Sequence, residues 1–338
     1  MRKQVVLVTG VNGEIGHSLV KHLAEKDQCD VIGLDVMPID NSLQPYVFKF
    51  IQGDILDQML LGRLVAEYEI RSIIHLASIL STKAEYNPET AHRVNVEGTL
   101  NLLRLAVEQA AWQGQSVKFI YPSSIAAYGI PSLEIKNQLD AVKEDDWLHP
   151  ITMYGCNKLY CENLGRYYAR HYKQLAADKI SHTIDFRCLR FPGLISAITI
   201  PTGGTSDYAP EMLHHAAQND PYACFVRPDS VLPFMVMPDA VKSILMLEKA
   251  DKKQLSQLVY NVTSFSPSAE EIREITLEAL PQAEISFKVD QKRQNIVDTW
   301  PAKIDDSAAR RDWQWEPDYD QTRAFSEYLI PGIKMHYQ

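Results

Sequence analysis

The sequence predicts an α/β protein built on a doubly wound parallel sheet, followed by a smaller C-terminal α/β lobe. Short apolar runs alternate with helical patterns up to about residue 190, a glycine-rich turn follows the first run, and the alternation stops at residues 190–192. Alternation of this regularity favours parallel strands joined by right-handed helical crossovers. The predicted architecture is therefore Rossmann-like.

Each predicted element rests on its own residue pattern. The strands are runs rich in Val, Ile and Leu that end at turn residues, and the helices carry apolar residues at a spacing of three and four. The predicted strands cover residues 4–8, 31–34, 47–51, 72–76, 117–121 and 183–189. The predicted helices cover residues 14–25, 57–68, 88–111 and 152–172.

Beyond residue 192 the pattern changes to loops that contain Pro and Gly, with helices at 239–249 and 269–280 and short strands near Leu258 and Ile285. We expect this part to form a lobe over the carboxyl ends of the strands. Residues 130–150 are charged and irregular, which predicts a solvated loop.

Composition excludes several classes of function. The chain has 338 residues, 46% of them hydrophobic, and a net charge of -9, so it can bury a large core but has no basic surface for nucleic acid. Its five cysteines are odd in number and lack CxxC spacing, which argues against a disulfide framework or a metal site. The apolar run at residues 5–8 is too short for a signal peptide, and no segment has membrane-spanning length, so we expect a cytoplasmic protein.

The glycine-rich turn predicts a dinucleotide site. Gly10, Gly13 and Gly16 follow a predicted strand and open a helix, whose free amides suit a pyrophosphate. Asp35 ends the second strand, where its carboxylate can accept hydrogen bonds from both adenosine ribose hydroxyls and would repel a 2'-phosphate. No Arg or Lys follows it directly, so NAD is favoured over NADP. The alternative is a plain glycine turn.

Tyr154 and Lys158 predict a general base. Four residues apart, they share one face at the start of a helix. An ammonium about 6 Å from the phenol contributes roughly 2 to 3 kcal/mol at an effective dielectric near 20. We therefore expect the phenol pKa to fall roughly two units below its ordinary value near 10. Ser123 and Ser124 end the preceding strand and could donate to the same substrate oxygen, unless they only cap a loop.

Four stretches together resemble the extended short-chain dehydrogenase/reductase superfamily over nearly the whole chain: residues 9–16, 75–78, 123–129 and 154–158. The resemblance implies that Ser124, Tyr154 and Lys158 form the catalytic trio. It also implies an adenine-contacting segment at 53–55 and a helix position behind the site at Asn95. The expected cofactor-binding residues are Gly10, Asn12, Gly13, Glu14, Ile15, Gly16, Asp35, Asp54, Ile55, Leu76, Ala77, Ser78, Asn95, Tyr154 and Lys158. Cys156-Asn157 departs from the usual small-hydroxyl pair.

Most members of this layout act on nucleotide sugars, but three positions argue against such a substrate here. Pro192 stands where those enzymes usually hold phosphate with Asn, and Leu232 where they usually have Arg. Residues 125–126 lack the acid-base pair of the dehydratases. A diphosphate would therefore meet few donors.

Other stretches resemble the short-chain type of L-threonine 3-dehydrogenase, namely residues 76–81, 189–196, 201–209, 232–235 and 299–301. This resemblance implies a pocket for a small zwitterion. For Trp300, the alternative to a place in this pocket is packing in the core. The expected substrate-binding residues are Ser81, Ser124, Tyr154, Gly193, Thr205 and Trp300. Ser124 and Ser206 stand where that type often has Thr, and residues 130–150 are longer and could form a lid.

We therefore predict NAD-dependent oxidation of the β-hydroxyl of L-threonine, or of a similar small β-hydroxy acid, to the 3-oxo product. The alternatives are a nucleotide-sugar 4-epimerase and a non-catalytic NAD-sensing regulator. We expect residues 1–190 to form the NAD-binding domain, joined by 233–262, and residues 191–232 and 263–338 to form the substrate lobe.

A homodimer is also expected. Leu100, Leu103, Leu164 and Tyr168 place apolar side chains on more than one face of two helices. The superfamily pairs its subunits through the corresponding helices as a four-helix bundle. Burial under the sheet within one chain is the alternative.

Overall fold

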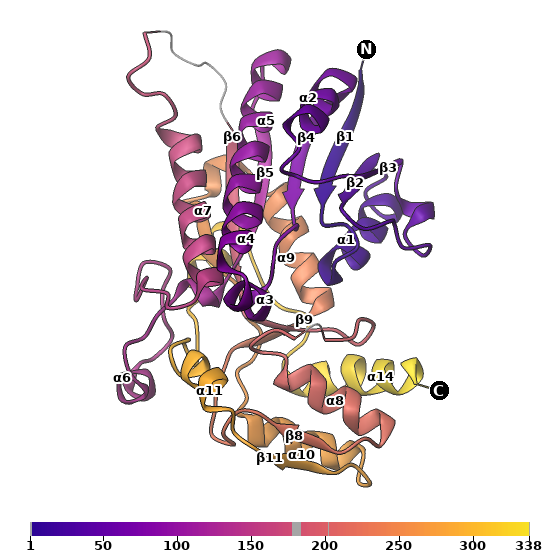
Figure 1. The fold of residues 1–338 in the computed structure, drawn as a ribbon, viewed down its shortest axis with the longest axis vertical. Helices are drawn as coiled ribbons and strands as arrows, with labels where there is room; N and C mark the ends of the chain where they lie inside the picture. Colours follow the sequence, from indigo (N-terminus) through magenta and orange to yellow (C-terminus); the bar gives the residue numbers. More distant parts are fainter. Residues whose placement is uncertain (1, 178–183, 202, 338) are drawn as a thin grey trace.

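A seven-stranded parallel sheet forms the larger part of the protein (Figure 1). The computed structural model describes residues 2–177, 184–201 and 203–337. The strand order β10-β6-β5-β4-β1-β2-β3 reverses direction beside β1, as a doubly wound sheet requires. The predicted fold class is confirmed. The strands are β1 Lys3–Thr9, β2 Val31–Asp35, β3 Lys49–Gln52, β4 Tyr68–His75, β5 Val117–Ser124, β6 Ile184–Phe191 and β10 Val259–Asn261.

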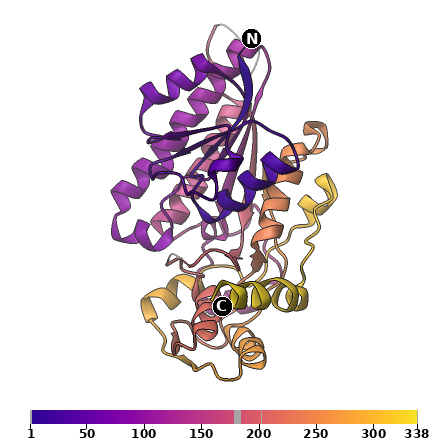
Figure 2. The ribbon, with the colours of Figure 1, turned by 90° about the vertical axis from the view of Figure 1, so that its right-hand side faces the viewer.

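Helices cover both faces of this sheet. One face packs against α1 and α9, and the other against α2, α5 and α7 (Figures 1 and 2). The strand β2 between them is buried on both sides, which is why it reads as a continuous apolar run. The strand β6 is fully buried as well, although it includes Asp185, Arg187 and Arg190. The bounds of these helices are α1 Glu14–Glu25, α2 Gln58–Glu67, α5 Gly98–Gln113, α7 Met153–Arg170 and α9 Met237–Lys249.

The helix predicted over residues 88–111 is divided in the structure. It starts as α4 Pro88–His92, widens into a π-helical turn at η2 Arg93–Glu97, and continues as α5. This π-helical turn brings Asn95 against the loop after β4, where its Oδ1 accepts a hydrogen bond from Ile79 N. The apolar periodicity of the sequence does not reveal such a turn. The strand predicted from Thr183 begins at Ile184 in the described part, because Thr183 lies outside the described residues, as does Thr202.

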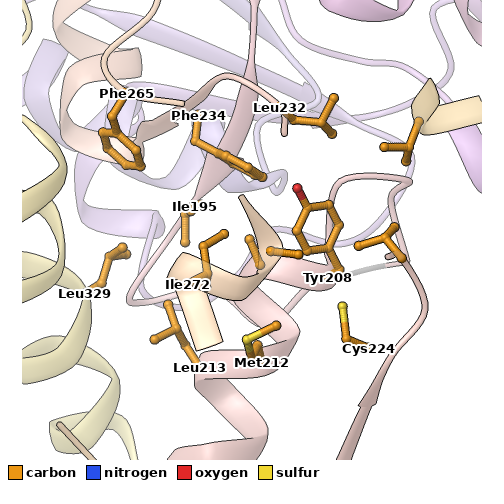
Figure 3. Close-up of a cluster of buried hydrophobic side chains, with 14 of the residues drawn as sticks. Ile195, Tyr208, Met212, Leu213, Cys224, Leu232, Phe234, Phe265, Ile272 and Leu329 are labelled. Atoms are coloured by element: carbon orange, nitrogen blue, oxygen red, sulfur yellow. The ribbon is translucent and has the colours of Figure 1, made fainter. Parts of the chain in front are cut away.

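The smaller lobe lies below the carboxyl ends of the strands (Figure 2). Its core contains Tyr208, Met212, Phe234, Ile272 and Leu329, which Figure 3 shows gathered between its helices. Two short parallel sheets pair β8 with β11 and β7 with β9. The strands are β7 Gly193–Ile195, β8 Tyr222–Cys224, β9 Phe234–Val236 and β11 Ile285–Phe287, and the longer helices are α8 Tyr208–Gln218, α10 Ala269–Ala279 and α11 Gln291–Asp298.

Short helices complete the chain, and several of them were not predicted because they are only one or two turns long. They are α3 Ser81–Tyr86, α6 Leu133–Gln138, α12 Ser307–Trp313, α13 Gln321–Arg323 and α14 Ile330–His336, with the turns η1 Gln44–Tyr46, η3 Ile125–Ala127, η4 Lys252–Gln254 and η5 Ala324–Leu329. Within the described ranges, no helix has both the length and the apolar character to cross a bilayer.

The segment 130–150 keeps most of its charges exposed, as expected of a solvated loop, among them Lys143, Asp145 and Asp146, but it is also attached to the lobe. Its helix α6 begins where the Ser132 hydroxyl accepts a hydrogen bond from Ile135 N. Ile130 N donates to Thr299 O over 2.8 Å, and Val142 N donates to Lys303 O over 3.0 Å. Backbone pairing of this kind fixes the segment beside Trp300.

Two of the four residues that suggested an extra apolar face are buried within the chain's own core. Leu103 and Tyr168 pack beneath the sheet with exposed fractions of 0% and 6%. The alternative interpretation, burial within one chain, is therefore correct for these two residues. The solvent face of α7 nevertheless carries Tyr160 and Tyr167, which are 54% and 40% exposed.

Candidate active site

The glycine-rich turn closes tightly between β1 and α1. Gly10 has a φ of 68°, and a Cβ on it would lie 2.6 Å from Ala77 N. A Cβ on Gly16 would lie 2.3 Å from Val11 O. Both positions therefore require glycine. Because α1 begins at Glu14, the amides of its first turn lack intrahelical partners and are available to an anion.

The carboxylate of Asp35 lies at the end of β2 beside this turn. Its Oδ2 accepts from Asn12 N over 3.0 Å, and its Oδ1 accepts from Met37 N over 3.0 Å. Each oxygen keeps a lone pair, and the side chains that follow, Val36 and Met37, are exposed and uncharged. An amide cradle beside a fixed carboxylate fits NAD and would disfavour a 2'-phosphate.

A cavity of about 470 Å³ opens between the turn and the lobe. Most of the predicted cofactor residues line it, and so do all the predicted catalytic and substrate residues: Gly10, Asn12, Gly13, Glu14, Ile15, Gly16, Leu76, Ser78, Ser81, Ser124, Tyr154, Lys158, Gly193, Thr205 and Trp300. The predicted residues outside its lining are Asp35, Asp54, Ile55, Ala77 and Asn95. One cavity thus brings together residues up to 290 positions apart in the chain, from Gly10 to Trp300.

The residues outside the lining have different surroundings. Asp54 is exposed and accepts from Leu56 N, whereas Ile55 is buried against Gly98 of α5. Asn95 is buried behind the wall: its Oδ1 accepts from Ile79 N over 2.7 Å, and its Nδ2 donates to Ile79 O over 3.0 Å. Asn95 therefore holds the loop after β4 in place from behind the cavity wall, and its predicted role in cofactor binding stays a prediction.

Tyr154 and Lys158 are presented by the first turns of α7. The Thr152 hydroxyl begins this helix by accepting from Gly155 N over 3.1 Å. The Lys158 ammonium lies 5.4 Å from the centre of the Tyr154 ring and donates to Pro122 O over 2.7 Å. Ser124 Oγ, at the end of β5, accepts from Ala126 N over 3.2 Å. The three side chains thus meet at the same wall of the cavity.

The predicted lowering of the phenol pKa is wrong for this structure. Burial raises the pKa of Tyr154 well above its ordinary value. Burial also lowers the pKa of the Lys158 ammonium to about 8. Desolvation of both groups outweighs their mutual attraction, which the estimate from sequence had considered alone.

Cys156 and Asn157, which depart from the family pattern, lie away from the reacting side of α7. Cys156 is exposed, and its thiol is free. Asn157 is buried, and its Oδ1 accepts from Asn95 Nδ2 over 3.4 Å. The departure is accommodated because neither residue belongs to the lining of the cavity.

In the lining of the same cavity, Ser81 and Thr205 form a hydroxyl pair. Thr205 donates to Ser81 Oγ from its backbone N over 3.2 Å and from its hydroxyl over 3.1 Å. Because Ser81 Oγ accepts both bonds, its own proton is free to be donated to a further acceptor. Trp300 lines the cavity and is also packed in the lobe core, where it is only 4% exposed, and its role in binding substrate stays a prediction. Leu232, in contrast, is buried in the lobe core.

A buried ion pair beside the site was not predicted. Arg190 and Glu162 are 0% and 1% exposed at their side chains, and they form two hydrogen bonds of 2.8 and 2.6 Å. The Ser123 hydroxyl donates to Glu162 Oε1 over 2.6 Å. Glu162 lies four residues after Lys158, so helical spacing could have placed it on the same face. Its arginine partner is visible only in the folded chain.

In the part of the chain that the structure describes, no group of three or more His, Cys, Asp or Glu side chains is arranged to hold a metal ion. The five cysteines are free thiols.

The doubly wound sheet, the glycine turn and the Tyr-Lys pair define a nicotinamide-dependent oxidoreductase. Residues 6–263 match the NAD dependent epimerase/dehydratase family, and the chain belongs to that family. Its expected cofactor, NAD, is thereby confirmed.

Among its relatives are L-threonine 3-dehydrogenases. The mitochondrial enzyme of that name from Bos taurus is 34% identical over 323 residues, which cover 94% of this chain and 80% of the relative. A monomeric L-threonine 3-dehydrogenase from a metagenome, solved in its apo form, is 36% identical with a TM-score of 0.85, covering 99% of this chain and 100% of its own. The L-threonine dehydrogenase of Clostridium difficile is 32% identical, also with a TM-score of 0.85, covering 99% of each chain.

Proposed function

We propose that this protein oxidises the β-hydroxyl of L-threonine with NAD⁺ to give 2-amino-3-oxobutanoate. The observation that carries the proposal is one cavity whose lining contains both the Tyr154–Lys158 pair and the Ser81–Thr205 hydroxyl pair. The relatives named L-threonine 3-dehydrogenase, which match nearly the full chain, support the same substrate.

The charges of the cavity support a small zwitterion rather than a nucleotide sugar. Among the described residues that line it, Lys158 is the one Lys or Arg side chain, and the same lining contains two carboxylates, Glu14 and Asp207. A second diphosphate, beyond that of the cofactor, would find no guanidinium there. The 4-epimerase alternative is therefore less supported. A regulator without catalysis would have no use for a Tyr-Lys pair in the cavity wall.

Each side chain has a definite task in the proposed reaction. The ionised Tyr154 oxygen removes the proton from the β-hydroxyl, and Ser124 orients that hydroxyl by hydrogen bonding. The free hydroxyl proton of Ser81 is donated to the substrate carboxylate, and Thr205 fixes the orientation of Ser81. NAD⁺, when bound on the glycine turn, accepts the hydride from the β-carbon, and its positive ring favours the ionised phenol. Lys158 adds a second positive charge near that oxygen.

The test is net formation of NADH. We expect the protein to reduce NAD⁺ when L-threonine is added and to give no lasting NADH signal with a nucleotide sugar, because an epimerase returns the hydride within each cycle. A variant of the proposed substrate site, Ser81→Ala, should raise KM for threonine with little change in kcat. It removes the hydroxyl that is proposed to donate to the carboxylate of the substrate. Epimerised nucleotide sugar without NADH from threonine or other β-hydroxy acids would contradict the proposal.

We also propose a homodimer in which α5 and α7 of two protomers form a four-helix bundle. The exposed Tyr160 and Tyr167, seven residues apart, supply one apolar stripe on α7. Light scattering should give twice the mass of one chain, and Tyr160→Asp should reduce it to one chain. A mass of one chain for the unaltered protein would contradict the dimer. One relative is known as a monomeric enzyme.

The five free thiols support a reducing compartment, for which we propose the cytoplasm.

A further inference from the structure

Two carboxylates line the cavity, one from the sheet domain and one from the smaller lobe. Glu14 is the first residue of α1, and Asp207 directly precedes α8 in the lobe. Both belong to the lining of the same cavity of about 470 Å³. Asp207 is held firmly, because its Oδ2 accepts from Gly203 N over 2.9 Å and from Gly204 N over 2.5 Å.

The surroundings of Glu14 contain little to neutralise it. The charged group that acts on Glu14 is Asp207, which raises the pKa of Glu14. The hydroxyl of Thr199 has a smaller effect in the opposite direction. His17, one turn further along α1, is directed elsewhere: its Nδ1 pairs with Gly13 O and its Nε2 lies 3.6 Å from Asp40. Lys158, on α7, is bound to Pro122 O in another wall of the cavity.

Behind Asp207 the lobe adds one cation and one further carboxylate. Arg293 donates to Gly204 O over 2.8 Å, and its guanidinium lies 3.2 Å from the centre of the Phe225 ring. Glu211, one turn into α8, accepts a hydrogen bond from the Tyr222 hydroxyl over 2.7 Å. Arg293 and Glu211 are both bound to partners within the lobe. Asp207 is therefore the charged group of the lobe that acts on the pKa of Glu14.

This arrangement creates a conflict at the glycine turn. The free amides at the start of α1 suit an anion, yet the first side chain of the helix is itself an acid. A pyrophosphate on the turn would bring further negative charge to a site that already contains Glu14 and Asp207. The simplest resolution is to protonate one carboxylate. Burial, reinforced by Asp207, raises the pKa of Glu14 to about 7, which makes it the group that responds near neutral pH.

We propose that Glu14 takes up one proton from solvent when the dinucleotide binds, so that its neutral carboxyl donates a hydrogen bond to the pyrophosphate instead of repelling it. Glu14 is thus a proton-linked determinant of cofactor affinity. This inference rests on the proposed use of the glycine turn for the dinucleotide.

The direction of the pH dependence follows from linkage. Below about pH 6 Glu14 is already protonated in the free protein, so NAD⁺ affinity should not change with pH. Above pH 7 binding requires proton uptake, so the dissociation constant should rise. Between pH 6 and pH 8.5 we expect the dissociation constant to rise about 30-fold, because pH 8.5 lies about 1.5 units above the pKa of Glu14.

The experiment measures proton uptake by calorimetry on the full chain, with both NAD⁺ and ADP-ribose as ligands. ADP-ribose contains the pyrophosphate without the nicotinamide ring, so effects at Tyr154 are separated from those at Glu14. Titrations at pH 7 in two buffers of different ionisation enthalpy should give uptake of about half a proton, because a group with a pKa near 7 is half ionised there.

Glu14→Gln keeps the shape of the side chain and removes its titration. It should abolish proton uptake, match the affinity of the unaltered protein at pH 6 and bind about 30-fold more tightly at pH 8.5. Glu25→Gln, at the exposed far end of the same helix, is the matched control and should leave the uptake unchanged. Equal uptake in Glu14→Gln, or none in the unaltered protein, would overturn the role of Glu14 alone. Failure of either ligand to bind would overturn the proposed dinucleotide site as well.

Discussion

Tyr154→Phe is expected to lower the rate of NADH formation from L-threonine by about 10³-fold or more, while NAD⁺ affinity stays within about twofold. The change removes only the phenol oxygen, which is the proposed proton acceptor. The ring remains, so its packing against the core of the lobe is kept. Steady-state rates and calorimetric NAD⁺ binding on the same preparation provide the measurement.

The pH profile gives this prediction a second readout. Because burial raises the pKa of Tyr154, the ionised form becomes more abundant as pH rises, and kcat/KM for threonine oxidation should increase from neutral to alkaline pH. The residual activity of Tyr154→Phe should lack that rise. A variant that keeps a tenth of the activity, or the same alkaline rise, would rule out Tyr154 as the base. Loss of both turnover and NAD⁺ binding would indicate a folding defect instead.

Glu162→Ala is expected to lower the free energy of unfolding by about 3–5 kcal/mol. The substitution leaves the guanidinium of Arg190 without its carboxylate at a position that is 0% exposed. The remaining partners of Arg190 are Glu144 O, at 2.5 Å, and the Tyr128 ring, whose centre lies 4.8 Å away. Neither carries the full negative charge that offsets the desolvation of a buried cation. Denaturant unfolding at neutral pH measures the difference.

An exposed ion pair on the same chain supplies the control. Arg323 and Glu327 are also joined through nitrogen and carboxylate oxygens, but their side chains are 50% and 51% exposed. Glu327→Ala should therefore cost less than about 1 kcal/mol. If Glu162→Ala were no more destabilising than this control, the buried pair would not be important for stability. Because Ser123 donates to Glu162 and precedes Ser124, the catalytic rate should fall along with stability.

The order of elements in the large domain could be predicted because each element has a local cause. A strand buried on both faces is favoured as a mostly apolar run, and a helix that packs on the sheet repeats its apolar residues about every 3.6 positions. The glycine positions are also local, since Gly10 and Gly16 are fixed by contacts within the turn and the adjacent strand loop. Short helices such as α6 and α13 carry too few residues for a period to be read, and the π-helical turn at Asn95 leaves the apolar spacing nearly unchanged.

The contents of the candidate site divide in the same way. The Tyr154–Lys158 pair is visible in sequence because four residues of helix place both side chains on one face. The Ser81–Thr205 pair joins residues 124 positions apart, and Glu162 meets Arg190 across 28 positions. The resemblance identified Ser81 and Thr205 as pocket residues, but their mutual hydrogen bonds depend on how the lobe closes onto α3.

The sequence by itself determined the doubly wound sheet, the dinucleotide turn and the identity of the residues around the cavity, because these follow from short-range periodicity, turn sterics and motif spacing. The tertiary structure alone decided the charge state of the site. Burial raises the pKa of Tyr154, lowers that of Lys158 to about 8 and raises that of Glu14 to about 7. Desolvation is set by every atom that surrounds a group, most of them distant in the chain, so it exists only once the lobe and the sheet have packed together.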